Sequence, residues 1–165
     1  MLAHIKQKIY TPDNLPSRLA QWRFQDKKIV FTNGCFDLLH YGHIDYLAAA
    51  RALGDLLIVG INSTASVQRL KGNHRPIKDD ITRQYLLASL FFVDAVIEFT
   101  EDTPLRLIQL IQPNVLVKGG DWAVENIVGS ELVLAKGSIV KSLPFVEGYS
   151  TTAIEKKIKQ NIKDL

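Results

Sequence analysis

The sequence contains a single cysteine, Cys35, among its 165 residues. One cysteine cannot form an intrachain disulfide, so a disulfide-stapled secreted scaffold is excluded and a reducing compartment is expected. No apolar run approaches the ~20 residues that a membrane-spanning helix needs. The first residues, MLAHIKQKIYTPDN, lack the apolar core of a signal peptide. We therefore expect a cytoplasmic protein with no membrane partner.

The sequence also has little excess charge of either sign. Twenty Lys and Arg against 17 Asp and Glu leave a net charge of +3. Part of the excess lies near the end, in Lys156, Lys157, Lys159 and Lys163. No aromatic residue separates these lysines, so they suit the solvated face of a terminal helix and no nucleic-acid partner is expected. A mild positive charge also fits a polyphosphate substrate.

Apolar segments alternate along the chain between two periodicities. Five runs rich in β-branched and large apolar residues predict strands at 28–33, 55–62, 95–99, 115–118 and 138–143. Helices are expected between them. Strand–helix alternation predicts an α/β fold: a single Rossmann-like, doubly wound, parallel five-stranded sheet with helices on both faces. The sheet domain is expected over 28–165, after an N-terminal helical extension at 1–27.

The last expected helix, 150–163, carries three isoleucines on one face. Ile154, Ile158 and Ile162 are spaced at i, i+4 and i+8, which predicts a stripe that docks on the core. In open parallel sheets, ligands bind beyond the carboxyl ends of the strands, where the strand order reverses. The segments expected there are 32–43, 60–63, 118–121 and the residues entering the last helix.

The segment 31–43 reads FTNGCFDLLHYGH and carries the strongest chemical signal. His40 and His43 lie three residues apart at a predicted helix start, which places both on one face. Gly42 between them leaves room for a base or a phosphate near the backbone. The free N–H groups of the helix start favour an anion. The histidine pair supplies only two metal ligands, so we expect no metal held by the protein.

These residues are the first of a series of motifs that occur in a recognisable order. The series continues with Ser66–Gly72, Arg75-Pro76, Val117–Asp121 and Gly148–Thr152. Together they resemble the cytidylyltransferase-like nucleotidyltransferase superfamily, and most of all its ADP-heptose-forming adenylyltransferases, over nearly the whole chain from Lys28. In many bacteria that domain is fused to a sugar kinase. Because these 165 residues hold no kinase portion, a stand-alone form is expected.

The resemblance implies a reaction and its partners. The expected enzyme transfers AMP from ATP to D-glycero-β-D-manno-heptose 1-phosphate, releasing pyrophosphate and forming ADP-heptose for lipopolysaccharide core biosynthesis. Mg²⁺ is expected to accompany ATP as the cofactor, with few protein ligands. A homodimer is implied, with 11–24 as an available interface. A separate kinase and phosphatase are expected in the same pathway.

The resemblance also assigns roles to residues. It gives His40, His43 and Lys71 the catalytic roles. It implies nucleotide binding by Thr32, Asn33, Gly34, Phe36, Gly42, Lys118, Gly120, Asp121, Tyr149, Ser150, Thr151 and Thr152. Substrate binding is expected of Asp37, Arg75 and Trp122.

Structural interpretations stay open for several of these residues. Lys71 can be an ordinary loop lysine, and Asp37 can stabilise a turn. The glycines of 118–121 can form a simple tight turn. The hydroxyls of 150–152 suit a helix cap on any interpretation. Arg75 and Arg83 can be ion-pair partners within the protein.

Other functions are weighed against this one. A CTP-dependent glycerol-3-phosphate cytidylyltransferase would usually carry an arginine where Phe145 stands. A phosphopantetheine adenylyltransferase would have an arginine at Glu155. A non-catalytic nucleotide-binding module would not need the two histidines, Lys71 and Lys118. A dinucleotide-dependent oxidoreductase would need Gly-x-Gly-x-x-Gly after the first strand, which reads Asn-Gly-Cys-Phe-Asp instead. The chain also departs from the favoured family at one position: Thr64 stands where members of that family usually have aspartate.

Overall fold

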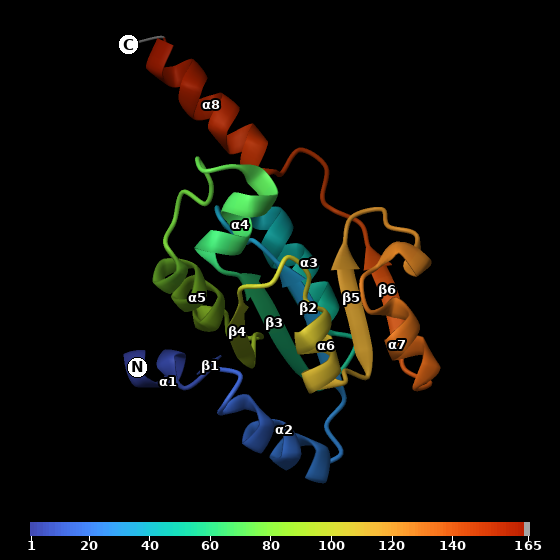
Figure 1. Ribbon diagram of the computed structural model, residues 1–165. Coiled ribbons are helices and arrows are strands. Elements are labelled where there is room, and N and C mark those ends of the chain that lie inside the picture. Colours follow the sequence, from blue (N-terminus) through green and yellow to red (C-terminus); the bar gives the residue numbers. More distant parts are fainter. Residues whose placement is uncertain (164–165) are drawn as a thin grey trace.

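A parallel sheet of six strands runs through the centre of the computed structural model, which describes residues 1–163 (Figure 1). The strand order is β1-β4-β3-β2-β5-β6. The strands are β1 (Ile9–Tyr10), β2 (Ile29–Gly34), β3 (Leu56–Asn62), β4 (Ala95–Phe99), β5 (Val115–Gly119) and β6 (Ile139–Leu143). The last two residues of the expected domain, 164 and 165, lie outside the described residues.

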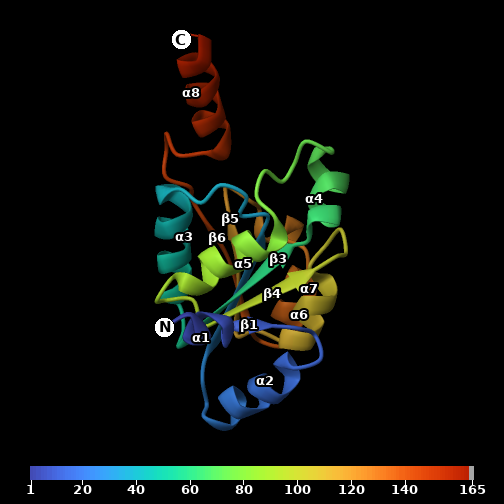
Figure 2. The same cartoon turned by 90° about the vertical axis from the view of Figure 1, so that its left-hand side faces the viewer.

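Helices cover both faces of this sheet. The helices in chain order are α1 (Leu2–Lys6), α2 (Leu15–Phe24), α3 (Tyr41–Arg51), α4 (Thr64–Lys71), α5 (Asp80–Ser89), α6 (Leu105–Ile111), the 3₁₀ turn η1 (Val124–Asn126), α7 (Ser130–Ala135) and α8 (Thr151–Lys163), of which α8 does not cover the sheet. Figure 2 shows α1, α3 and α5 on one face, with α2, α6 and α7 on the other. None of the helices in residues 1–163 has the length and apolar character to cross a bilayer.

Alternate residues of the strands build two separate cores. Ile58 and Ile97 belong to the cluster that α2, α6 and α7 cover. Val59 and Val96 belong to the cluster that α3 and α5 cover. Successive side chains of a strand point to opposite faces, so a strand buried on both faces is apolar throughout. The predicted doubly wound α/β fold is confirmed.

The predicted number of strands was wrong by one, because β1 joins the edge of the sheet. Ile9 pairs with Val96 and Tyr10 with Ile97, in parallel register. Two residues are too few to show an alternating pattern, and they lie in the segment expected to be helical. The helix that follows, α2, contributes Leu15, Leu19 and Trp22 to the core.

The docking predicted for the last helix was also wrong. α8 projects away from the body of the molecule (Figures 1 and 2), and Ile158 and Ile162 are 51% and 65% exposed. Spacing at i, i+4 and i+8 establishes only that three side chains share a face of the helix. It does not establish what that face contacts.

The strand order reverses between β2 and β5. From β2 the chain moves through β3 to β4 on one side, and β5 and β6 then add on the other side of β2. The connections above the carboxyl ends of β2 and β5 therefore leave in opposite directions. They open the crevice in which doubly wound proteins bind ligands.

The burial of α2 leads to a prediction for stability. We expect Leu19→Ala to lower the free energy of unfolding by about 2–5 kcal/mol, because it leaves a cavity beside the sheet. Leu19 is 1% exposed, whereas Phe24 on the same helix is 91% exposed. Phe24→Ala is therefore the matched control, with an expected change within about 0.5 kcal/mol. Urea unfolding of the three proteins measures both values; equal losses would show that α2 is not part of the core.

Candidate active site

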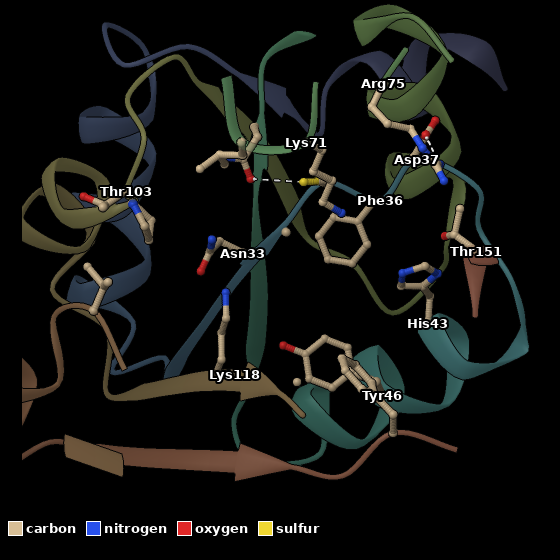
Figure 3. A pocket seen from close by; sticks show the side chains of 18 of the residues that line it. Asn33, Phe36, Asp37, His43, Tyr46, Lys71, Arg75, Thr103, Lys118 and Thr151 are labelled. Carbon is tan, nitrogen blue, oxygen red and sulfur yellow. Dashed lines mark hydrogen bonds and ion pairs between the residues drawn. The ribbon is translucent and has the colours of Figure 1, made fainter. Parts of the chain in front are cut away.

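A cavity of about 700 Å³ opens at the carboxyl ends of the central strands (Figure 3). Its wall combines the segment after β2, the ends of β3 and β5, the end of α4 and the start of α8. The cavity therefore lies at the predicted place in the fold. It brings together eleven of the predicted site residues: Asn33, Gly34, Phe36, Asp37, His43, Lys71, Arg75, Lys118, Trp122, Thr151 and Thr152.

The segment from β2 to α3 folds tightly around Phe36. Phe36 has φ +47°, an unusual conformation for a bulky residue. Its ring lies against Gly34, where a Cβ would approach within 3.0 Å, and 5.4 Å from the ring of His43. Any side chain at Gly34 would crowd the ring of Phe36. The ring of Phe36 therefore lies between Gly34 at the end of β2 and His43 in the first turn of α3.

The two histidines stack on each other at the start of α3. His40 is the N-cap residue, and its ring centroid lies 3.9 Å from that of His43. His43 lines the cavity, whereas His40 does not reach the cavity and packs against the ring of His43. The Nδ1 atoms of both rings are buried and lack a hydrogen-bond partner. Nε2 is therefore the atom through which His43 can meet a ligand.

Burial keeps both imidazoles neutral near pH 7. It lowers the pKa of His40. Burial first, and then the nearby charges of His40 and Lys71, lower the pKa of His43 to about 4. A neutral imidazole can still donate one hydrogen bond to a phosphate oxygen. An arriving polyphosphate would also favour the protonated form.

Two lysines reach the same cavity from different elements. Lys71 ends α4 and Lys118 lies on β5, and Figure 3 shows both side chains directed into the hollow. Burial is the main cause that lowers the pKa of Lys118; the nearby Cys35 acts to raise it, and the charge of Lys71 acts to lower it. Among residues 1–163 neither lysine forms an ion pair with a carboxylate. The cavity therefore holds positive charge that an anionic ligand would neutralise.

Asp37 and Arg75, both expected to bind substrate, are engaged with the protein. Asp37 accepts hydrogen bonds from the backbone N–H groups of Ile77, at 2.8 Å, and Lys78, at 3.0 Å, and from Arg75, at 2.9 Å. Burial works to raise the pKa of Asp37, but these hydrogen bonds outweigh it and hold the pKa below its ordinary value. Arg75 also pairs with Glu155 of α8. This matches the ion-pair interpretation of Arg75.

The hydroxyl cluster at the start of α8 divides between capping and the cavity. The Ser150 hydroxyl accepts a hydrogen bond from the backbone N–H of Ala153 at 3.0 Å, as expected of a helix cap. Thr151 and Thr152 line the cavity. Tyr149 instead packs edge-on against Tyr41, with ring centroids 5.0 Å apart.

At the end of β5, the glycines make room for aromatic side chains of the protein itself. A Cβ on Gly119 would lie 2.6 Å from the ring of Phe145. Gly120 has φ +107°, and its Cβ would meet Trp122 and Phe145. Trp122 donates from Nε1 to the Gly119 carbonyl at 3.1 Å. Phe145 and Trp122 form an apolar part of the cavity wall.

Seven predicted residues do not reach the cavity wall: Thr32, His40, Gly42, Gly120, Asp121, Tyr149 and Ser150. Thr32 points from β2 into the core beneath α3, where its hydroxyl hydrogen-bonds that of Tyr46. Gly42 is buried, and a Cβ there would lie 3.2 Å from both the His40 ring and Tyr149. The absence of a side chain at Gly42 therefore serves protein packing. Asp121 is exposed beyond the strand end.

Eleven further residues of the wall were not named as site residues, although Cys35, Asn62 and Gly119 lie within the segments expected at the ligand site. The eleven are Cys35, Tyr46, Asn62, Leu70, His74, Asp102, Thr103, Pro104, Gly119, Val128 and Phe145. Asp102–Pro104 lie in the loop that leads from the carboxyl end of β4 to α6, so the same reasoning applied to that strand would have pointed to this loop. Arg83 stays outside the wall. It is fully buried, pairs with Asp80, and donates to the carbonyls of Cys35 and Asn62 at 2.8 and 2.7 Å.

Protein ligands for a metal ion are scarce in the cavity. Within the described part of the chain, no group of three or more His, Cys, Asp or Glu side chains could hold a metal. The two carboxylates on the wall are occupied, Asp37 by Arg75 and Asp102 by Arg69 at 2.7 Å. Most ligands of a bound cation would therefore have to come from water or from a bound substrate and not from the protein.

Known proteins are similar to this chain over nearly its whole length. Residues 31–157 match the family model described as Cytidylyltransferase-like. The chain is 50% identical to "Bifunctional protein HldE" of Nitrobacter hamburgensis, over 94% of this chain and 35% of that protein. It is 51% identical to the protein of the same name from Trichlorobacter lovleyi, over 95% and 32%. The chain thus spans about a third of the length of these curated relatives.

Solved structures share the fold. A lipopolysaccharide core biosynthesis protein from Thermoplasma volcanium is 30% identical, with a TM-score of 0.59 over 75% of this chain and 99% of that one. Pantoate-beta-alanine ligase from Francisella tularensis, solved with β,γ-ATP and beta-alanine, is 16% identical, with a TM-score of 0.54 over 95% and 78%. At that identity the second likeness shows the fold alone.

The lowered pKa of His43 predicts a pH dependence of stability. Between about pH 4 and the ordinary value of 6.5, the unfolded chain binds a proton that folded His43 does not. The free energy of unfolding therefore falls as the pH falls through this range. We expect His43→Gln to lose less stability than wild type between pH 7 and pH 4.5.

Urea unfolding at both pH values measures this difference. Carboxylates also titrate in this range, so the informative quantity is wild type minus variant. His4→Gln, at an exposed position outside the cavity, is the control and should follow wild type. An equal loss of stability in wild type and His43→Gln would contradict the neutral, buried state of His43.

Proposed function

The chain belongs to the cytidylyltransferase-like family, and from that premise we propose that it transfers AMP from ATP to D-glycero-β-D-manno-heptose 1-phosphate. The products are ADP-heptose and pyrophosphate. The chain is a nucleotidyltransferase by its family and its relatives. The nucleotide and the acceptor are the proposed part.

One observation carries the proposal. A single cavity at the reversal of strand order collects His43, Lys71, Lys118 and the hydroxyls that begin α8. Two uncompensated lysines beside neutral hydrogen-bond donors suit a ligand with several negative charges. A polyphosphate is such a ligand. Transfer of a nucleotidyl group needs this stabilisation more than it needs a protein base.

The acceptor supplies its own nucleophile. The second pKa of a phosphate monoester is about 6, so the sugar phosphate is largely dianionic at pH 7. One of its oxygens attacks the α-phosphorus of ATP. The bond from that phosphorus to the bridging oxygen of the β-phosphate breaks, and pyrophosphate leaves with the electron pair. The protein aligns the two ends and stabilises the added charge.

The geometry suggests a division of labour along the cavity. His43, supported by His40, and the hydroxyls of Thr151 and Thr152 hold the β- and γ-phosphates. Lys71 and Lys118 neutralise charge at the α-phosphate and the acceptor phosphate. This is supported by the electrostatic influence of Lys71 on both His43 and Lys118.

Mg²⁺ enters with ATP in this proposal. Its ligands are chiefly phosphate oxygens and water, because Asp37 and Asp102 already pair with arginines. When bound, the ion neutralises phosphate charge. The chain's own residues orient the phosphates around it.

ATP is the preferred donor in this account. Phe145 occupies the place where CTP-dependent relatives usually carry an arginine, and its ring is part of the cavity wall. An apolar ring there offers a base no hydrogen-bond donor. A CTP-dependent glycerol-3-phosphate cytidylyltransferase is the alternative that the donor test below distinguishes.

The pathway is proposed from the names of similar proteins. The Thermoplasma volcanium protein is called a lipopolysaccharide core biosynthesis protein, and the curated relatives are called bifunctional. We place this chain in the same biosynthesis, in the cytoplasm, as a homodimer. A sugar kinase and a phosphatase prepare the 1-phosphate.

Pyrophosphate release tests the donor and the acceptor together. Purified protein with Mg²⁺ is incubated with ATP or CTP and a panel of sugar and polyol phosphates. We expect release with ATP and the heptose 1-phosphate. Release only with CTP and glycerol 3-phosphate would contradict the proposed substrates, and silence with every pair would contradict the proposed reaction.

Replacement of His43 tests the site. We expect His43→Ala to lower kcat/KM by about 10²–10³, because a donor to the phosphates is lost. Circular dichroism and the unfolding midpoint at pH 7.5 report whether the fold is kept. His4→Ala, remote from the cavity, should keep wild-type turnover. A folded His43→Ala protein with near-normal turnover would remove His43 from the site.

A further inference from the structure

α8 is attached to the body of the protein only at its beginning. Thr151 lies on the cavity wall, and Ile154 and Glu155 are half-buried. Beyond them the helix extends into solvent, and within residues 1–163 no other helix or strand packs along it (Figures 1 and 2). The segment before it contains Gly148, which has φ +83° and open space around it. The position of the Thr151 and Thr152 hydroxyls therefore depends on a few contacts.

Glu155 makes one of these contacts. It lies four residues after Thr151, so both side chains share one face of α8. Its carboxylate pairs with the guanidinium of Arg75. The other terminal nitrogen of Arg75 donates to Asp37 at 2.9 Å. We call this arrangement the Asp37–Arg75–Glu155 bridge.

The bridge connects three segments that are distant in sequence. Asp37 follows β2, and its second carboxylate oxygen accepts from the backbone of Ile77 and Lys78. Arg75 lies in the loop between α4 and α5, and Glu155 lies in α8. Figure 3 shows Arg75 and Asp37 together at the same end of the cavity as His43 and Thr151.

Burial makes this bridge more costly to break than an ordinary surface ion pair. The side chains of Arg75, Asp37 and Glu155 are 13%, 6% and 26% exposed. An exposed pair contributes little, but removing one partner of a buried pair leaves an uncompensated charge. A guanidinium can hold two carboxylates in fixed directions at once, which a lysine ammonium does less well.

We propose that Arg75 is a positioning residue, which holds the start of α8 over the cavity through Glu155 so that Thr151 and Thr152 are in place for the phosphates of the nucleotide. The nucleotide part of this proposal rests on the proposed function. Arg75 acts through α8 and not by contact with the substrate. Its charge is already shared between Asp37 and Glu155, so the phosphates are left to His43, Lys71 and Lys118.

Glu155→Gln is the main variant, because it keeps the shape of the side chain and removes its charge. It also leaves the Asp37–Arg75 pair intact, so the loop at 75–78 should stay folded. Glu155→Lys reverses the charge and should act in the same direction more strongly. Glu131→Gln, an exposed position in the first turn of α7, is the matched control. Arg75→Lys tests the other side of the bridge and should fall between wild type and Glu155→Gln.

Two measurements read the bridge separately. Hydrogen exchange by mass spectrometry, without nucleotide, reports the attachment of α8; we expect amides near 153–158 to exchange about tenfold faster in Glu155→Gln, as for ~1.4 kcal/mol. Steady-state kinetics report how well the phosphates of ATP are held; we expect the KM for ATP to rise about tenfold in Glu155→Gln. The KM for the acceptor and the unfolding midpoint should not change. A purely structural defect would alter both substrates and the midpoint together.

The outcomes decide the proposal. Faster exchange with a raised KM for ATP, absent in Glu131→Gln, supports it. Unchanged exchange in Glu155→Gln overturns the bridge, and faster exchange with an unchanged KM overturns its role in nucleotide positioning. Failure of wild-type protein to bind ATP in a calorimetric titration would overturn the proposed function and the positioning role with it. The exchange rates, measured without nucleotide, would then still test the attachment of α8.

Discussion

Repulsion between basic groups around one cavity is the constraint on which the site depends. Burial is the largest cause that lowers the pKa of His43 and of Lys118, and the charge of Lys71 lowers both further. No carboxylate of the described chain pairs with either lysine. A polyphosphate would relieve this repulsion on binding. The arrangement therefore gains free energy from the ligand that the proposed reaction requires.

The fold makes this arrangement possible by reversing the strand order at β2. Lys118 comes from β5 on one side of β2, and Lys71 follows α4, after β3, on the other. The start of α3 presents His43 to the same cavity. The apolar cores on both faces of the sheet hold these elements rigidly. The start of α8 is the exception, since it is held by a few polar contacts.

Much of the fold could be predicted because buried parallel strands have a distinctive pattern. β3 is buried at all seven positions and reads as a continuous apolar run. β1 could not be found, because two residues show no period. The orientation of α8 could not be found either, since Ile158 and Ile162 report a shared face and not its contact. β1 is too short to produce a pattern, and the exposure of Ile158 and Ile162 depends on how α8 is placed against the rest of the protein, which their spacing does not determine.

The site was predictable in position and less so in detail. The position of ligands at the carboxyl ends of parallel strands led to His43 and Lys118, and the family resemblance led to Lys71; all three line the cavity. Neither could show that the Thr32 hydroxyl turns into the core toward Tyr46, or that Asp37 is saturated by the loop at 75–78. Such details depend on side-chain partners from distant segments. The rule that ligands bind beyond the carboxyl ends of the strands identifies only residues close to each strand end in the sequence.

A crystal structure of the protein with Mg²⁺ and a non-hydrolysable ATP analogue would test the central claim most directly. The account predicts the triphosphate in the cavity between the ends of β2 and β5. His43 Nε2, Lys71 or Lys118, and a hydroxyl of Thr151 or Thr152 should then lie within hydrogen-bond distance of phosphate oxygens. A nucleotide bound elsewhere, or in the cavity with its phosphates away from His43 and α8, would contradict the account.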